Sequence, residues 1–167
     1  MKTWKVGLLF TTISIPLYAA FLYLTLILFF MLRATPAYPS DEDVLKPRVP
    51  SDKIAEAKAL KNTVAADVKI LSEAREIFTG KGTCYTCHGE KGKGDGEIAE
   101  SMNPPPRDFT YTPWQEVRTD GELFWVINNG TENGMPPFAD ILTDEERWSL
   151  VNYIREFGKS SSIASKQ

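Results

Sequence analysis

The longest pattern in the chain is a run of apolar residues near its N-terminus. Residues 6–32 contain no Asp, Glu, Lys, Arg or His. A helix rises about 1.5 Å per residue, so this run would extend roughly 40 Å, which exceeds the ~30 Å hydrocarbon core of a bilayer. The pattern predicts a single transmembrane helix inside an anchor that covers residues 1–33.

A cleaved signal peptide is the alternative interpretation of this run. The apolar core of a signal peptide has about 7–15 residues, so the longer run here favours an uncleaved anchor. Lys2 and Lys5 precede the run, whereas Arg33 follows it and an acidic stretch begins soon afterwards at residues 41–43. The positive-inside rule therefore predicts a cytoplasmic N-terminus and an exported C-terminal domain.

Residues 34–68 are interpreted as a linker between the anchor and that domain. Four prolines lie within residues 34–52, and proline-rich segments form extended, semi-rigid spacers. The following segment, residues 53–68, is rich in Ala and Lys and predicts a short helix and a loop. We expect the linker to hold the domain away from the membrane.

Helical periodicity returns in residues 69–158, which we assign to the domain itself. Apolar residues recur at helical spacing over residues 69–79, and Gly80 and Gly82 end that helix. Glycines and prolines are then frequent through residues 89–113, which predicts a loop.

Two capping-box patterns mark two further helices, because a glutamate stands three residues after each of two threonines. Thr119 begins a helix that extends to about Asn128, and Thr143 begins an amphipathic helix of about four turns that Gly158 ends. The tail, residues 159–167, is expected to be flexible. Because no alternating strand pattern appears, the sequence predicts an all-α fold.

The candidate chemistry lies between the first two of these helices. Cys84, Cys87 and His88 form a C-x-x-C-H motif that contains both cysteines and the single histidine of the chain. This motif is typical of covalent c-type haem attachment. Two thiols three positions apart can reach the two vinyl groups at one edge of a porphyrin, and the next residue can direct its imidazole at the iron. The sequence therefore predicts one covalent haem c.

A zinc site and a thioredoxin-like redox pair are the alternatives for this motif. Tetrahedral zinc needs a fourth ligand beyond two cysteines and one histidine, and the chain has no further Cys or His. A redox pair of the thioredoxin type is expected after a strand in a βαβ unit, and the sequence predicts no strand. Haem attachment is therefore favoured.

The second axial ligand of the iron decides what the site can do. Met135 and Met102 are the two methionines that lie outside the initiation site and the apolar run. Met135 is favoured because Gly134 and two prolines flank it, which makes a stiff loop that can present a thioether. Met102 follows His88 by only 14 residues and remains the alternative ligand.

Charge and composition exclude several classes of function. Three of the 19 basic residues and none of the 22 acidic residues lie in residues 1–33, so residues 34–167 carry a formal charge of −6. A nucleic-acid-binding domain is expected to be basic, and that class is disfavoured. Two cysteines also exclude a scaffold that depends on many disulfides.

With these motifs in place, the chain resembles the class I cytochromes c. The resemblance covers residues 70–158 and is strongest at GKGTCYTCHGEKGKGDG, NPPPRDFT, NNGTENGMPPF and LTDEERWSLVNYIREF. With its predicted anchor, the chain is most similar to the membrane-anchored monohaem cytochromes attached to bacterial respiratory complexes. The resemblance implies a periplasmic haem domain, single-pass attachment to the bacterial cytoplasmic membrane, and partner redox proteins or subunits.

The resemblance also implies two structural roles. The first and last helices of the family cross near the haem, and Ala74 and Phe78 on the first helix would then meet Leu150 and Tyr153 on the last. A proline carbonyl of the family accepts the N–H of the ligand histidine. That carbonyl would come from one of three consecutive prolines, Pro104, Pro105 and Pro106.

Several residues have a functional and a plainer interpretation. Trp114 and Trp125 either line the haem pocket or fill the core, and Arg107 either pairs with a haem propionate or is a solvated loop cation. Three lysines form either a solvated face or a small docking patch for an acidic partner: Lys81, Lys91 and Lys93.

Ligation by His88 and Met135 would fill both axial positions and leave no open site for a substrate, with a raised reduction potential. The leading hypothesis is thus a membrane-tethered electron carrier, not itself an enzyme, that acts as a subunit of a respiratory complex or as a shuttle. A haem-based gas sensor or a peroxidase-like enzyme with a displaceable methionine is the alternative. A mainly structural anchor subunit is a third interpretation.

Overall fold

The computed structural model describes residues 18–29, 40–132 and 134–164. The chain divides into two compact units, residues 1–39 and residues 40–167. In the first unit, residues 18–29 are helical, and their large apolar side chains are exposed, such as Tyr18, which is 71% exposed.

Most of the predicted anchor lies outside the described residues, which include only residues 18–29 of its apolar run. Among the residues that are described, no helix combines the length and the apolar character needed to cross a membrane. The transmembrane helix therefore stays a prediction.

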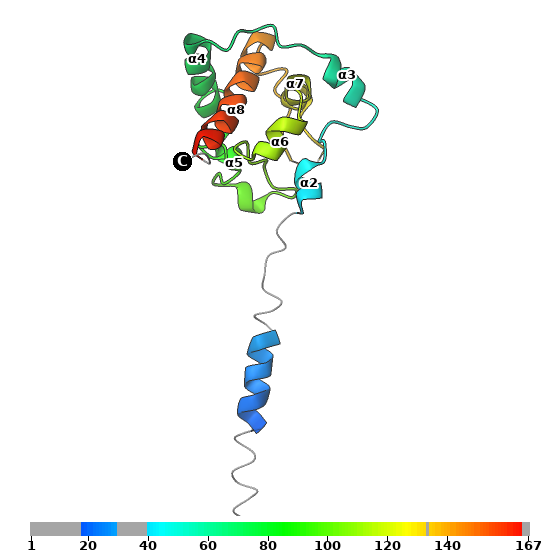
Figure 1. The fold of residues 1–167 in the computed structure, drawn as a ribbon, viewed down its shortest axis with the longest axis vertical. Coiled ribbons are helices and arrows are strands. Elements are labelled where there is room, and N and C mark those ends of the chain that lie inside the picture. Colours follow the sequence, from blue (N-terminus) through cyan, green and yellow to red (C-terminus); the bar gives the residue numbers. More distant parts are fainter. Residues whose placement is uncertain (1–17, 30–39, 133, 165–167) are drawn as a thin grey trace, which may run out of the picture. The chain divides into compact units, whose positions relative to one another are not determined.

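The second unit is built from helices and loops (Figure 1), and none of its described residues forms a strand. The all-α prediction for this part of the chain is confirmed. The helices are α2 (Asp41–Leu45), α3 (Ile54–Ala59), α4 (Val68–Thr79), α5 (Tyr85–His88), α6 (Thr112–Val117), α7 (Asp120–Asn129) and α8 (Asp144–Ala164), with a short 3-10 turn at Ala99–Ser101.

The core forms where α4 packs against α8, as Figure 1 shows. Ala74 and Phe78 on α4 are buried. The Phe78 ring meets that of Tyr153 on α8 edge to face, with centroids 5.4 Å apart, and Leu150 is only 1% exposed. The predicted crossing of the first and last helices is confirmed, with a small residue and aromatic rings at the contact.

Both capping boxes predicted from the sequence are present. At the start of α7, Thr119 Oγ1 accepts from the backbone N–H of Glu122, whose carboxylate accepts from the N–H of Thr119. At the start of α8, Thr143 and Glu146 exchange the same two bonds, at 2.8 and 3.2 Å. These bonds satisfy N–H groups that the first turn of each helix leaves unpaired.

The prediction that Gly158 ends the last helix is wrong, because α8 continues to Ala164. Glycine serves a different purpose at this position. A Cβ atom on Gly158 would lie 2.8 Å from Cγ of Gln115, on α6. The residue is therefore a point of close approach between two helices, which its sequence neighbours do not reveal. The first six residues of the tail that we expected to be flexible belong to this helix.

The compact unit begins at Ser40, whereas the sequence analysis began the domain at residue 69. The short helix expected within residues 53–68 is present as α3, but it packs against α7: a Cβ atom on Gly121 would lie 2.0 Å from the carbonyl oxygen of Ala57. Asn62 donates to Asn152 of α8 at 2.8 Å, and Asn152 donates to the carbonyl of Val64 at 3.0 Å. Residues 40–68 are thus part of the domain and not a free spacer.

Candidate functional site

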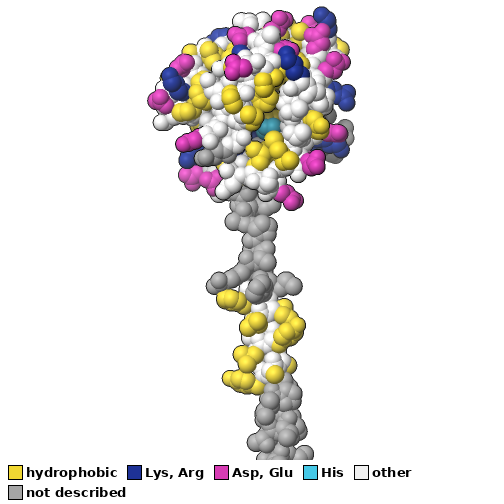
Figure 2. Space-filling view, turned by 180° about the vertical axis from the view of Figure 1, so that it is seen from behind, with side chains coloured by type: hydrophobic (Ala, Val, Ile, Leu, Met, Phe, Trp, Pro, Cys, Tyr) yellow, Lys and Arg dark blue, Asp and Glu magenta, His cyan; other side chains and the backbone are white. Residues whose placement is uncertain are grey.

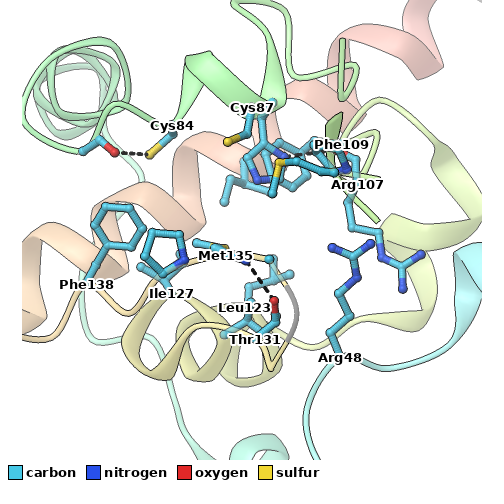
Figure 3. Close-up of a pocket in the computed structure, with 18 of the residues that line it drawn as sticks. Arg48, Cys84, Cys87, Arg107, Phe109, Leu123, Ile127, Thr131, Met135 and Phe138 are labelled. Carbon is cyan, nitrogen blue, oxygen red and sulfur yellow. Dashed lines mark hydrogen bonds between the residues drawn. The ribbon is translucent and has the colours of Figure 1, made fainter. Parts of the chain in front are cut away.

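The C-x-x-C-H motif folds into the short helix α5. Cys84 stands at its N-terminal cap, and Cys87 and His88 lie within its single turn. All three line one cavity of about 370 Å³ (Figure 3). In the space-filling view, the single histidine is visible in a hollow bordered by apolar side chains (Figure 2). The motif therefore opens directly onto a space that can accept a large apolar group.

The His88 ring is held in a defined tautomer. Its Nδ1 lies 3.2 Å from the carbonyl oxygen of Arg107. A carbonyl can only accept, so Nδ1 carries the proton and Nε2 keeps its lone pair. The ring also stacks on Phe109, with centroids 4.3 Å apart. Burial lowers the pKa of His88 to about 4, so the imidazole is neutral near pH 7 and suited to bind iron through Nε2.

The acceptor of this N–H differs from the prediction, which placed it at Pro104, Pro105 or Pro106. It is the carbonyl of Arg107, the next residue. The φ angle of Gly94 is +74°, and a Cβ atom there would lie 2.7 Å from the carbonyl oxygen of Pro106. The same Cβ atom would lie 3.3 Å from the carbonyl oxygen of Arg107, so Gly94 leaves room for the carbonyls of both Pro106 and Arg107 in this loop.

The two cysteines are partly buried and form no disulfide with each other. Burial raises the pKa of Cys84 to about 12, so its thiol is neutral. Metal sites bind cysteine as the thiolate, and a neutral thiol in an apolar pocket is less suited to that purpose. It is well suited to form a thioether bond, in which the S–H adds across a vinyl group.

Met135 reaches the same cavity from the loop that follows α7. Thr131 makes two hydrogen bonds to the backbone of Met135. The N–H of Thr131 donates to the carbonyl of Met135 at 2.9 Å, and Thr131 Oγ1 accepts from the N–H of Met135 at 3.0 Å. This role of Thr131 was not predicted, because no local sequence pattern indicates it. The bonds fix the backbone of Met135, while its flanking prolines limit the conformations open to the loop.

Gly130 allows this loop to fold back on the end of α7. Its φ angle is +71°, and a Cβ atom there would lie 2.5 Å from the carbonyl oxygen of Met135. A side chain at this position would be strained and would also collide with the loop. Gly130 therefore contributes to the position of Met135.

Met102, the alternative ligand, also lines the cavity. Its methyl group would lie 3.5 Å from a Cβ atom on Gly134, so it sits beside the loop that carries Met135. The fold thus brings both candidate methionines to one site. Met135 remains the predicted ligand because Thr131 and the flanking prolines restrain its loop.

The remaining wall of the cavity is mostly apolar. Trp114 is 4% exposed and lines it, whereas Trp125 does not. The other apolar residues that line the cavity and belong to the buried core are Phe109, Leu123, Ile127, Phe138 and Ile154. Such a wall excludes water from a bound group and suits the apolar face of a porphyrin.

Arginine side chains gather at one side of the cavity. Arg107 was interpreted either as a partner of a haem propionate or as a solvated loop cation. Its guanidinium donates to the carbonyls of Asp43 and Lys46, at 2.9 and 2.7 Å. Arg48 and Arg118 line the cavity as well. Neither residue was predicted from the sequence, because Arg48 lies in the segment assigned to the linker and Arg118 in a turn between helices.

The three lysines considered as a docking patch do not form a uniform set. Both carboxylate oxygens of Glu146 accept from Lys81 Nζ, at 3.0 Å each. Lys81 therefore ties the loop before the C-x-x-C-H motif to the start of α8. Lys91 and Lys93 are exposed beside that motif.

The donor set and the cavity together fit a covalently attached haem. Cys84 and Cys87 supply two thiols on one turn of helix, and His88 supplies a neutral imidazole whose free nitrogen is Nε2. Met135 supplies a soft sulfur donor, and the wall between them is apolar.

The chain is similar to several known proteins. The family model described as "Cytochrome C oxidase, cbb3-type, subunit III" matches residues 71–154. A chain of the reducing HAO-like protein complex of Kuenenia stuttgartiensis is similar, with 25% identity and a TM-score of 0.50 over 75% of this chain and 53% of that one. The KustC0563 c-type cytochrome is 32% identical over 50% of this chain and 95% of that one, with a TM-score of 0.45. No curated protein matches.

Proposed function

Because the chain belongs to the family described as cytochrome c oxidase, cbb3-type, subunit III, we propose that it is an electron carrier with a single haem ligated by His88 and Met135. The chain is a class I c-type cytochrome, an electron-transfer protein that binds haem c covalently. The number of haems, their axial ligands and the attachment of the chain to a membrane complex are the parts that we propose.

One observation carries the proposal: Cys84, Cys87, His88 and Met135 all line the same cavity. When bound, the haem supplies one-electron chemistry. His88 is held by the Arg107 carbonyl in the tautomer that leaves Nε2 free, and Thr131 holds the backbone of Met135. Two protein ligands leave no open coordination position, and the apolar wall keeps water away, which favours electron transfer over substrate chemistry.

The apolar run at residues 6–32 supports the proposal that the carrier is tethered to the bacterial cytoplasmic membrane with its haem domain in the periplasm. A tether of this kind raises the effective concentration of the domain at a nearby partner, toward the mM range for a short flexible linker. Such a carrier delivers electrons locally and does not need to diffuse through the periplasm.

Association with other redox subunits is also part of the proposal. The family description names a subunit of an oxidase, and the similar Kuenenia stuttgartiensis chain belongs to a reducing HAO-like protein complex. This chain spans about half the length of that relative. We therefore propose a redox subunit or shuttle of a membrane respiratory complex, without enzymatic activity of its own.

The optical spectrum of the detergent-purified, reduced protein tests the ligation, with and without carbon monoxide. We expect the wild-type spectrum to stay unchanged, because Met135 occupies the sixth position. The variant Met135→Ala should bind carbon monoxide readily. The matched control Met102→Ala removes the other thioether at the cavity and should behave as the wild type does.

Two results would contradict the ligation. A clear carbon monoxide shift in the wild type would indicate an open or labile site, and a haem-based sensor or a peroxidase-like enzyme would then become the better hypothesis. A shift in Met102→Ala but not in Met135→Ala would assign the sixth position to Met102.

A further inference from the structure

The electrostatic character of the cavity is opposite to that of the domain around it. Residues 34–167 carry a formal charge of −6. Among the side chains that line the cavity, however, four are cationic and only one, Glu122, is anionic. The cationic ones are Lys46, Arg48, Arg107 and Arg118. An excess of positive charge beside an apolar cavity is costly unless an anion accompanies it.

Three guanidinium groups produce most of this excess. Arg118 forms an ion pair with Glu122 at 2.8 Å, but the hydrogen bonds of Arg48 and Arg107 go to backbone carbonyls. The Nε atom of Arg118 is buried and has no hydrogen-bond partner among the described residues. We call Arg48, Arg107 and Arg118 the arginine subsite.

The three groups lie close enough to affect one another. Burial and the neighbouring charges of Arg48 and Arg118 lower the pKa of Arg107 to about 10, and the opposing charge of Asp43 offsets only part of this. Figure 3 shows Arg48 and Arg107 together at one side of the cavity, away from Cys84. Arginine side chains carry a permanent positive charge in proteins, so the subsite is a lasting cluster of cations.

The segment Ser40–Val49 holds this cluster in place. Carbonyl oxygens at the C-terminal end of α2 accept from two of the arginines: Asp43 and Lys46 accept from Arg107, and Leu45 accepts from Arg118, at 2.7 to 2.9 Å. The same segment supplies the third arginine, Arg48, which donates to the carbonyl of Pro105.

The chemistry of a covalently attached haem identifies the anion. The vinyl groups that receive the thiols of Cys84 and Cys87 lie at one edge of the porphyrin, and the two propionates lie at the opposite edge. Arginine is the side chain best suited to bind carboxylates, because its planar guanidinium can donate two parallel hydrogen bonds.

Resting on the function proposed above, we propose that the segment Ser40–Val49 is part of the haem site, where it completes an arginine subsite for the two haem propionates. The segment lies outside residues 71–154, which the family model matches. The functional haem unit of this chain therefore begins about thirty residues upstream of the family domain, at Ser40.

This arrangement has a consequence for the reduction potential. Ferric haem carries one more positive charge than ferrous haem, so a nearby arginine destabilises the ferric form and raises the potential. Removal of Arg48 takes away that cation and also leaves a propionate charge less compensated. Both effects favour the ferric state, so both lower the potential.

A spectroelectrochemical titration of the full holoprotein in detergent tests the proposal with three variants. Arg48→Gln removes the charge, Arg48→Lys keeps the charge without the planar fork, and Arg75→Gln is the matched control. Arg75 lies exposed on α4 and does not line the cavity. Resonance Raman bands of the propionates provide a second readout that reports hydrogen bonding directly.

We expect Arg48→Gln to shift the reduction equilibrium toward the ferric form by severalfold or more, where tenfold corresponds to 59 mV for one electron, and to shift the propionate bands. Arg48→Lys should lie between Arg48→Gln and the wild type, and Arg75→Gln should match the wild type. If Arg48→Gln has the potential and propionate bands of Arg75→Gln, the proposal is wrong.

The reduced spectrum with carbon monoxide, recorded on the same samples, separates this result from a failure of the proposed function. A wild type that stays closed to carbon monoxide keeps the proposed ligation, so an unchanged potential in Arg48→Gln then contradicts only the arginine subsite. Should Arg48→Gln lose its haem or fail to fold, the Arg48→Lys variant decides: wild-type propionate bands in that variant contradict a guanidinium contact.

Discussion

At the scale of single residues, the haem site depends on atoms that hold the two proposed ligands. Arg107 accepts the His88 N–H through its backbone carbonyl and donates with its guanidinium to α2. Thr131 makes two backbone-directed bonds to Met135. A C-x-x-C-H motif identifies the donor atoms by their spacing alone, but the groups that orient those donors come from distant loops and leave no comparable pattern in the sequence.

Thr131→Val should weaken the hold on Met135. Valine has nearly the same shape as threonine but cannot accept from the Met135 N–H, and one such bond contributes about 1 kcal/mol. We expect the open form of the reduced haem to become several times more populated, and carbon monoxide to bind to T131V faster than to the wild type in a stopped-flow measurement. Thr79→Val is the control, because Thr79 bonds to Arg75 on the exposed side of α4. Equal rates in T131V and the wild type would show that Thr131 does not restrain the ligand.

At the scale of secondary structure, the elements with strong local signals were predicted correctly. The helices at α4, α7 and α8 have helical apolar spacing or a capping box, and each begins within one residue of the predicted position. The end of α8 was predicted wrongly, because the role of Gly158 depends on Gln115 of another helix. The helix α6 was not predicted, since it spans only six residues and carries no clear periodicity.

The capping box of α8 gives a prediction at this scale. Thr143→Ala removes the cap and should lower the free energy of unfolding by about 1 kcal/mol, measured by urea denaturation of the holoprotein. Thr112 is the first residue of α6, whose N-cap is Tyr111, so Thr112→Ala should cost less. An equal cost for both variants would argue against the box.

The same cap makes stability depend on pH through Glu146. The hydrogen bond that the Thr143 backbone N–H donates is the main cause that lowers the pKa of Glu146 below its usual 4.5. The hydrogen bond from Lys81 is the second cause. Between the folded-state pKa and the higher unfolded-state pKa, the unfolded state binds more protons than the folded state. The contribution of Glu146 to stability is therefore present above pH 4.5 and is lost as the pH falls through the folded-state pKa. The stability difference between the wild type and Glu146→Gln should therefore be largest near neutral pH and shrink on acidification. A difference that is constant with pH would exclude this linkage.

At the scale of the whole molecule, the domain is larger than its family match. Residues 40–68 supply Arg48, the buried Ala57, and Asn62, which bonds to α8. A proline-rich segment without periodicity is expected to be a spacer, and the sequence analysis interpreted it in that way. The side-chain hydrogen bonds that join this segment to the rest of the domain connect residues 57 to 90 positions apart, so its neighbours in sequence hold no record of them.

Two shortened chains test this boundary. A chain that begins at Ser40 should keep its haem and the stability of the full domain, because residues 40–167 form one compact unit. A chain that begins at residue 69 should lose on the order of 3 kcal/mol or more through lost burial and hydrogen bonds. Urea denaturation of both holoproteins measures the difference. If the two are equally stable, residues 40–68 are a spacer as first expected.

Fractionation of the full chain and of the chain from Ser40 also tests the anchor, since only the full chain should accompany the membranes.

The sequence by itself determined the features that depend on near neighbours: the haem-attachment motif, the helices of the core, their capping boxes and the all-α class. Periodicity and motif spacing are local features, so both can be recognised in one amino-acid sequence. Tertiary structure alone decided which carbonyl orients His88, how Thr131 and Gly130 place Met135, and why α8 continues past Gly158. It also decided that three arginines from separate segments meet at one cavity. These features arise where loops far apart in sequence approach closely, and the free energy of each contact depends on a partner that local pattern cannot identify.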